Sequence, residues 1–152
     1  MSTTRIRCHV KAPRAKVYRA LLDARALAAW RVPPGMTSHV HAFEPREGGR
    51  VCVSLTYDSP TETGKSAAHT DTYHGHIVKL VQDEQVVEVV EFETAEPSLQ
   101  GEMTLTLTLT DADGGTEVLA IHEGLPPGVP AADNETGWRL SLARLAALVE
   151  AG

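Results

Sequence analysis

The sequence predicts an α+β fold for one domain over residues 1–152. We expect an antiparallel sheet of six to seven strands, two short helices after the first strand, and one long C-terminal helix. Two observations predict this class. From about residue 38 to 124, apolar and polar residues alternate with the period of two that is typical of strands. After residue 130, apolar residues recur at helical spacing to the end of the chain.

Composition and charge narrow the classes of function. The chain has 152 residues, with 42% hydrophobic and 22% charged residues, as in ordinary globular domains with a buried core. Its net charge of -6 argues against a nucleic-acid partner, which requires a basic surface. The sequence contains neither a membrane-spanning apolar run nor the apolar core of a signal peptide. We therefore expect a cytoplasmic protein without a membrane partner; monomer and homodimer both remain open.

The N-terminal region predicts a strand followed by two short helices. Residues 3–10, TTRIRCHV, form the strand pattern. Pro13 suits the first position of a helix, where its missing N–H costs nothing. Asp23 can cap a second helix that carries Leu27 and Trp30. Cys8 lies far in sequence from the other cysteine, Cys52, and we expect both thiols to be reduced.

The central region predicts strands in pairs. SHVHAFE at 38–44 and RVCVSLTY at 50–57 flank the turn PREGG and indicate a hairpin. TDTYHGHIVKLV at 70–81 and EQVVEVVEFET at 84–94 indicate the next pair, in which Gly75 suggests a bulge. GEMTLTLTLT at 101–110 and TEVLAIHEG at 116–124 flank a turn rich in Asp and Gly.

The C-terminal helix carries an apolar stripe. At 100° per residue, Trp138, Leu142, Leu145 and Val149 fall within an arc of about 60°. A helix with such a stripe, placed after a run of antiparallel strands, is expected to pack across their sheet.

A phosphate-binding motif is only partly present at 59–66, SPTETGKS. The ending Gly-Lys-Ser fits a P-loop, but Ser59 replaces its first glycine. A P-loop also needs a helix directly after this point, because the helix N-terminus helps to hold phosphate. A strand pattern follows instead, so we interpret residues 58–68 as a hairpin loop and expect no ATP binding.

Five stretches are spread, in this order, over nearly the whole chain: VYRALLDARALAAW (17–30), FEPREGGRV (43–51), TYHGHIVKL (72–80), GGTEVLAIHEGLP (114–126) and GWRLSLARLAALV (137–149). They resemble a known family, named for the activator of heat-shock protein 90 ATPase, and in particular the C-terminal domain of that activator. The family belongs to the START-like superfamily, together with the birch pollen allergen and aromatic polyketide cyclases.

The resemblance implies a helix-grip fold, in which a curved antiparallel sheet wraps the long C-terminal helix and often leaves a cavity between them. Members bind hydrophobic small molecules, act as co-chaperones or serve as cyclases. The superfamily shares no catalytic set, so the resemblance implies no catalytic residue and no cofactor. Asn134 stands where members often have His three residues before the Gly-Trp pair.

Two titratable residues are candidates for chemistry. Glu88 shares the more apolar face of its strand with Val90, so it is expected to point inward, where burial would raise the pKa of its carboxyl. The alternative is a carboxylate near the strand edge that is solvated or paired with an arginine. His122 shares a face with Ala120. It can hydrogen-bond a ligand or act as a base at a cavity wall, or it is a core histidine bonded to a backbone carbonyl.

Other residues offer ligand contacts. Asn134 precedes Trp138 by one helical turn and can orient a polar ligand group, or instead bond backbone N–H groups at the helix start. Trp30, Tyr57, Tyr73 and Trp138 can form aromatic walls or simply fill the core. The side to which Tyr73 points stays open, because a bulge at Gly75 would shift the register of its strand. The small residues Ala120, Ala143 and Ala146 could leave room beneath the helix.

A metal site is not expected. His39 with His41, and His74 with His76, each place two imidazoles on one face of a strand. No third ligand is evident, and the two pairs fall on strands that are not expected to be neighbours. Solvent-facing histidines are the better interpretation.

We therefore predict a protein that binds a small, mainly hydrophobic molecule between sheet and C-terminal helix, without metal or cofactor. One alternative is a cyclase or hydrolase that uses Glu88 and His122 for acid–base work. Another alternative is a co-chaperone-like interaction domain. This hypothesis is weaker because the chain resembles only the C-terminal domain of the activator and not its partner-binding N-terminal domain. The predicted ligand-binding residues are Trp30, Val53, Leu55, Tyr57, Tyr73, Glu88, Val90, Ala120, His122, Asn134, Trp138 and Leu142.

Overall fold

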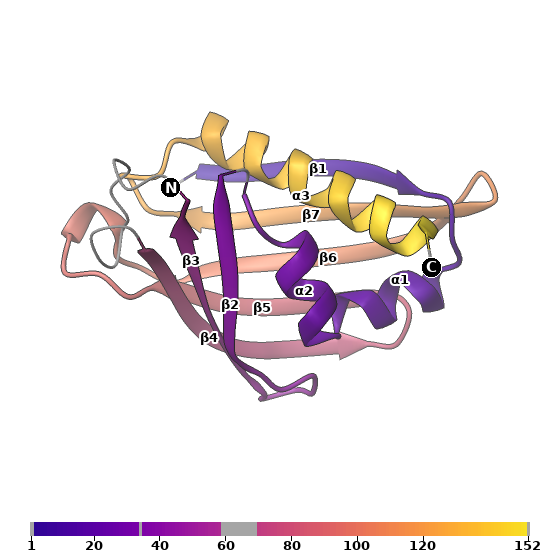
Figure 1. The fold of residues 1–152 in the computed structure, drawn as a ribbon, viewed down its shortest axis with the longest axis horizontal. Helices are drawn as coiled ribbons and strands as arrows, with labels where there is room; N and C mark the ends of the chain where they lie inside the picture. Colours follow the sequence, from indigo (N-terminus) through magenta and orange to yellow (C-terminus); the bar gives the residue numbers. More distant parts are fainter. Residues whose placement is uncertain (1, 34, 59–69, 152) are drawn as a thin grey trace.

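Three helices lie over one face of an antiparallel sheet in the computed structural model, which describes residues 2–33, 35–58 and 70–151 (Figure 1). Its strands are β1 (Ser2–Val10), β2 (Met36–Phe43), β3 (Arg50–Tyr57), β4 (Thr70–Val81), β5 (Gln85–Phe92), β6 (Met103–Ala112) and β7 (Gly115–Leu125). Its helices are α1 (Arg14–Leu21), α2 (Ala24–Trp30) and α3 (Ala131–Ala151), with a short 3-10 turn at Pro97–Leu99. The stretch at 59–66 that partly matches a P-loop lies outside the described residues.

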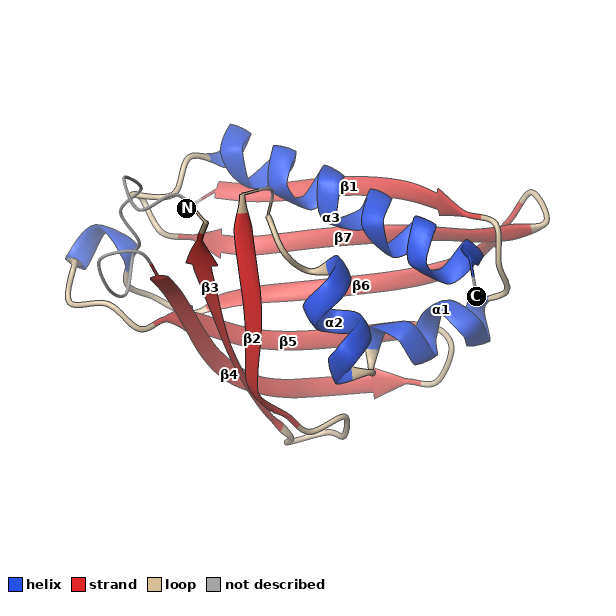
Figure 2. Cartoon of the chain, in the orientation of Figure 1, coloured by secondary structure: helices blue, strands red, loops and turns tan. Residues whose placement is uncertain are grey.

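The sheet wraps around the long helix. Within the described residues, its seven strands are hydrogen-bonded in the order β1-β7-β6-β5-β4-β3-β2, and every neighbouring pair is antiparallel. The sheet bends so that β2 and β3 run across the direction of β5, β6 and β7 (Figure 2). This is the predicted α+β, helix-grip arrangement with seven strands.

Alternation of side chains along each strand separates the core from the outer face. In β6, Met103, Leu105, Leu107 and Leu109 are all buried, whereas the threonines between them are more exposed. Since successive side chains of a strand point to opposite faces, these apolar residues line the concave side of the sheet. Burial of such a surface is the main favourable term in folding.

Local sequence explains where the short helices begin. Pro13 precedes α1 in extended conformation, which matches the fixed φ of proline. The Asp23 carboxylate accepts hydrogen bonds from the backbone N–H groups of Arg25 and Ala26 and thereby caps α2. The helix ends at Trp30, which is fully buried, and the chain then passes Arg31 on its way to β2.

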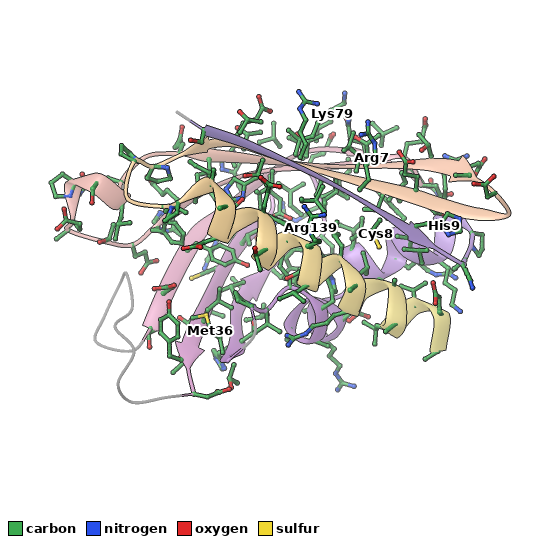
Figure 3. All side chains as sticks on the ribbon, turned by 90° about the horizontal axis from the view of Figure 1, so that it is seen from above. Arg7, Cys8, His9, Met36, Lys79 and Arg139 are labelled. Carbon is green, nitrogen blue, oxygen red and sulfur yellow. The ribbon has the colours of Figure 1, made fainter. Side chains whose placement is uncertain are left out.

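Helix α3 buries its predicted stripe. Trp138, Leu142, Leu145 and Val149 are buried, and Ser141 lies among them. The helix packs against β1 and α2. Arg139 projects from the outer side, as seen from above in Figure 3. None of the described helices is long and apolar enough to cross a membrane.

Two expectations from the sequence are wrong. The bulge in β4 does not lie at Gly75, whose register with β3 and β5 is regular, but between Ile77 and Lys79. A Cβ at Gly75 would collide with the backbone carbonyl of Val89, so glycine is required for close strand approach. Ala143 is exposed, so it leaves no room beneath the helix.

The two cysteines are both free. Cys8 points from β1 toward α3, where its Sγ lies 3.7 Å from the backbone carbonyl oxygen of Leu142 (Figure 3). Partial burial, together with the nearby Glu150 carboxylate, raises the pKa of the Cys8 thiol. Because the thiolate is the reactive form, this environment favours an inert thiol.

Candidate functional site

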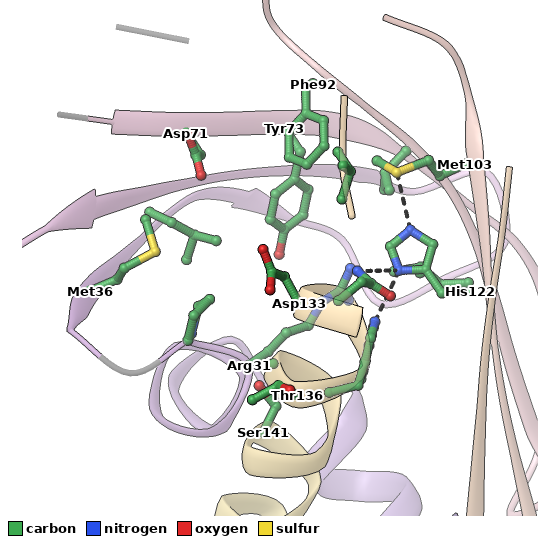
Figure 4. A pocket seen from close by; sticks show the side chains of 18 of the residues that line it. Arg31, Met36, Asp71, Tyr73, Phe92, Met103, His122, Asp133, Thr136 and Ser141 are labelled. Atoms are coloured by element: carbon green, nitrogen blue, oxygen red, sulfur yellow. Dashed lines mark hydrogen bonds between the residues drawn. The ribbon is translucent and has the colours of Figure 1, made fainter. Parts of the chain in front are cut away.

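A pocket of about 490 Å³ lies between the concave side of the sheet and the first half of α3 (Figure 4). Strands β2 to β7, the segment just after α2 and the segment before α3 all contribute to its wall. Its size falls within the range of roughly 300–1,000 Å³ that is typical of small-molecule sites. The wall is mainly apolar, with polar groups contributed by α3, by the chain after α2 and, on the sheet side, by Asp71, Tyr73 and His122.

Seven of the twelve residues predicted from the sequence line this pocket. They are Leu55, Tyr57, Tyr73, Val90, His122, Asn134 and Trp138. The uncertain orientation of Tyr73 is resolved, since its side chain points inward and is 6% exposed. Asn134 lies in the first turn of α3 and faces the pocket instead of capping backbone N–H groups.

The other five lie in the packed core beside the pocket. They are Trp30, Val53, Glu88, Ala120 and Leu142, and each is buried. Trp30 packs against Trp138, with ring centroids 6.4 Å apart. Leu142 belongs to the half of α3 that packs in the core without bordering the pocket. The pocket is therefore confined to the N-terminal half of α3, and it does not extend to Ala143 and Ala146, where the sequence suggested room beneath the helix.

His122 is held by two side chains of α3. The indole Nε1–H of Trp138 donates a hydrogen bond to Nδ1 of His122 over 2.9 Å. The side-chain nitrogen of Asn134 lies 3.3 Å from the same Nδ1 atom. On the other side of the ring, Nε2 lies 3.1 Å from the sulfur of Met103. The predicted backbone carbonyl partner is thus replaced by an indole, an amide and a thioether.

This geometry fixes the protonation of His122. An indole N–H can only donate, so Nδ1 must carry the lone pair and Nε2 the proton. The pKa of His122 is lowered to about 3, mainly by burial and to a smaller extent by the positive charge of Arg31. The imidazole is therefore neutral at physiological pH, and its one basic nitrogen is already occupied.

Glu88 forms a buried ion pair with Arg31. A single guanidinium nitrogen, Nη1, lies 3.0 Å and 2.9 Å from the two carboxylate oxygens of Glu88. Burial is the largest single effect and disfavours the charge on Arg31, but the charge and hydrogen bond of Glu88 together with Tyr73 outweigh it, and the pKa of the guanidinium is raised. Of the two interpretations of Glu88, the inward orientation is correct, and pairing with an arginine accompanies it.

Arg31 also connects the ion pair to the pocket wall. Its guanidinium carbon lies 5.2 Å from the ring centroid of Tyr73 and 5.8 Å from that of Trp138, distances at which a cation is attracted to an aromatic face. Arg31 lines the pocket, whereas Glu88 lies behind it. Arg31 was not among the residues predicted from the sequence. A carboxylate expected to point inward at position 88 indicates that a buried cation is needed, but it does not identify which arginine supplies that cation.

Two buried polar atoms in this wall have no hydrogen-bond partner: the hydroxyl oxygen of Tyr73 and the side-chain oxygen Oδ1 of Asn134. Leaving a buried polar group unsatisfied costs on the order of 1–3 kcal/mol. Such atoms are rare in proteins, and each calls for a functional or structural explanation.

The histidine pairs lie elsewhere, on the outer face. His39 and His41 belong to β2 and His74 and His76 to β4, and β3 separates the two strands, as expected. His74 contacts the carboxylates of Glu91 and Glu93 at 3.4 Å and 3.0 Å. Among the described residues, no group of three or more His, Cys, Asp or Glu is arranged to hold a metal ion.

Comparison with known structures shows the same fold elsewhere. A crystal structure of a Chromobacterium violaceum protein is 32% identical, with a TM-score of 0.87 over 97% of this chain and 96% of that one. A Rhodobacter sphaeroides protein is 21% identical, with a TM-score of 0.80 over 99% and 93% of the two chains. DynU16, encoded in the dynemicin biosynthetic locus, is 22% identical with a TM-score of 0.68, and the match covers 99% of this chain but 48% of DynU16.

The family assignment comes from the sequence. No curated protein matches the chain significantly. The family model described as "Activator of Hsp90 ATPase homolog 1-like protein" matches residues 11–150, from the end of β1 to the last turn of α3. The chain therefore belongs to the Activator of Hsp90 ATPase homolog 1-like family.

Proposed function

We propose that this protein binds a small, mainly hydrophobic molecule in the pocket beneath the first half of α3. The observation that carries the proposal is a 490 Å³ pocket with an apolar wall and two unsatisfied buried polar atoms. A hydrophobic wall with a small number of placed polar groups is the usual composition of a small-molecule site.

Apolar contact would supply most of the affinity. Met36, Leu55, Phe92, Leu105 and Trp138 give the pocket aliphatic and aromatic surfaces from β2, β3, β5, β6 and α3. Each roughly 100 Å² of apolar ligand surface removed from water contributes about 2.5 kcal/mol. The cost of association and of ordering side chains reduces this gain.

Acid–base catalysis by Glu88 and His122 is disfavoured by the contacts of both groups. Glu88 is ion-paired with Arg31 and lies behind the pocket wall. The basic nitrogen of His122 already accepts the hydrogen bond from Trp138. A general base needs a free lone pair within reach of the substrate. Neither group offers one, so binding is the function that the pocket supports best.

Gly137 provides a sharp test of the proposal. It lines the pocket from within α3, and a Cβ built there meets no atom within 4 Å. Gly137→Leu would place a side chain at the pocket, and its Cβ would displace no neighbour. Since glycine is a poor helix former, the substitution should stabilise α3 or leave its stability unchanged. It should, however, reduce or abolish ligand binding.

The experiment is a fluorescence titration with a library of hydrophobic compounds. Trp30→Phe is the background, because Trp30 also emits and its indole nitrogen has no hydrogen-bond partner to lose. We expect the emission of Trp138 to shift on binding, and Gly137→Leu to suppress the shift. Ala143→Leu, an exposed change on the outer side of the same helix, is the matched control and should bind normally. Absence of any response, or equal binding by Gly137→Leu, would refute the proposal.

A further inference from the structure

The hydrogen-bonding character of the pocket is set by His122. Its Nδ1 atom is an acceptor, because the indole N–H of Trp138 can only donate to it. The side-chain atom of Asn134 nearest to Nδ1 must therefore also be a donor. An amide NH₂ group satisfies this requirement, whereas an amide oxygen would place two acceptors 3.3 Å apart. His122 thus orients the amide of Asn134.

This orientation leaves Oδ1 of Asn134 as a fixed acceptor. The atom is buried, it has no partner, and its residue lines the pocket. Rotation of the amide by 180° would exchange the NH₂ group and Oδ1, but it would place Oδ1 against Nδ1 of His122 and break the contact. A ligand that satisfies it must bring an O–H or N–H group.

The second unsatisfied group is the hydroxyl of Tyr73, on the sheet side of the pocket. A phenolic hydroxyl can donate and accept, so it offers a ligand hydroxyl a second partner in the same pocket wall. Burial raises the pKa of Tyr73, and therefore this hydroxyl stays protonated and able to donate. Together the two groups match a ligand hydroxyl, which donates once and accepts once.

The charges around the pocket disfavour an anionic ligand. Among the lining residues that the structure describes, the cation is Arg31, and it is already neutralised by Glu88 at 2.9 Å. Two further carboxylates, those of Asp71 and Asp133, line the same pocket. An added carboxylate would be desolvated without gaining an uncommitted cation, which is unfavourable.

We propose that the pocket selects a neutral, ring-containing hydrophobic molecule whose hydroxyl group donates to Asn134 Oδ1 and accepts from Tyr73. The rings of Tyr57, Phe92 and Trp138 in the wall favour an aromatic or flat alicyclic skeleton. This inference rests on the proposed function and adds the chemical class of the ligand. Tyr73 and Asn134 are the specificity-determining residues, and His122 is a positioning residue.

The test compares four probes with one skeleton: naphthalene, naphthol, the methyl ether of naphthol, and naphthoate. Binding is measured by calorimetry at constant salt. We expect naphthol to bind about tenfold more tightly than its ether, a difference of about 1.4 kcal/mol, and naphthoate to bind more weakly than either. The ether retains an acceptor but has lost the donor, so the comparison isolates the bond to Asn134.

Two variants test which residues cause the differences in affinity between the probes. Asn134→Leu should reduce the preference for naphthol over the ether to less than threefold, while naphthalene still binds. Tyr73→Phe should weaken naphthol and the ether alike relative to naphthalene, because both probes retain the oxygen that accepts from Tyr73. Val90→Ala, an apolar change in the same wall, should alter the affinity for all four probes and keep the preference. Thermal unfolding of each variant confirms that it is folded.

The outcomes separate this inference from the proposed function. If naphthol and its ether bind equally, or naphthoate binds most tightly, the assigned ligand class is wrong although the pocket still binds. If the preference for naphthol over the ether persists in Asn134→Leu, the assignment of Asn134 is wrong. If Tyr73→Phe leaves the affinities of naphthol and the ether unchanged relative to naphthalene, the assignment of Tyr73 is wrong. If neither these probes nor a wider hydrophobic library bind, the proposed function fails as well.

Discussion

Protonation of His122 should make the fold sensitive to mild acid. The pKa of His122 is about 3 in the folded protein, against 6.5 for an ordinary histidine. Between these two values, the unfolded chain binds a proton that the folded chain does not. Lowering the pH therefore favours unfolding, and the free energy of unfolding falls as the pH drops below about 6.5. The slope approaches about 1.4 kcal/mol per pH unit between the two pKa values. Below about pH 3, the contribution of His122 to the free energy of unfolding no longer changes.

The magnitude follows from these two pKa values. Between about pH 7.5 and pH 5, His122 alone should reduce the free energy of unfolding by about 2 kcal/mol. The carboxylates titrate mainly at lower pH, so this interval isolates histidine. His122→Gln removes the titration, and its side-chain oxygen can still accept from the Trp138 indole.

Urea unfolding at the two pH values measures the effect. The wild type should lose about 2 kcal/mol more than His122→Gln over this interval. His76→Gln, which changes an exposed histidine of β4 in the same way, is the control and should retain the wild-type loss. An equal pH dependence in wild type and His122→Gln would refute the assignment of a buried, neutral His122.

Two further predictions concern packing and charge, and both are measured by urea unfolding. Glu88→Gln should cost about 3–5 kcal/mol because it leaves Arg31 buried without its counter-charge. The double variant Arg31→Met with Glu88→Met should recover most of the lost free energy of unfolding. If it does not, the unpaired charge of Arg31 is not the cause of the loss in Glu88→Gln. Leu142→Ala should cost about 2–5 kcal/mol, since Leu142 is 1% exposed and packed away from the pocket. Leu55→Ala should cost less because Leu55 borders the pocket and already lacks some contacts; equal losses would contradict the position of the pocket.

Much of the fold was predictable because local chemistry and periodicity agree. The alternation in MTLTLTLT gives β6 a single interpretation, and Asp113 and Gly114 adopt the positive φ values that a tight hairpin turn needs. The stripe on α3 likewise predicts which residues are buried. Gly75 was misjudged because a glycine within a strand signals either a bulge or a close backbone approach, and the sequence does not distinguish the two.

The site was predictable only in part. Strand periodicity placed Val90 on the inward face of its strand, but it left the side of Tyr73 open and did not by itself place His122. It also did not show how far the space beneath α3 extends. That extent depends on the curvature of the sheet and on the position of Arg31 after α2. The hydrogen bond from Trp138 to His122 joins residues from a helix and a strand. Such a pairing depends on tertiary packing, which periodicity does not encode.

The most direct test of ligand binding is a map of the binding site by nuclear magnetic resonance. The indole N–H of Trp138 is a specific probe, because its hydrogen bond to His122 lies at the pocket wall. On titration with naphthol, we expect the largest shift changes at the Trp138 indole, the Asn134 side-chain amide and the backbone of Tyr73. Residues on the outer face, such as His41 and His76, should remain unchanged. Shift changes confined to the outer face, or none at all for naphthol and a wider hydrophobic library, would contradict binding in this pocket.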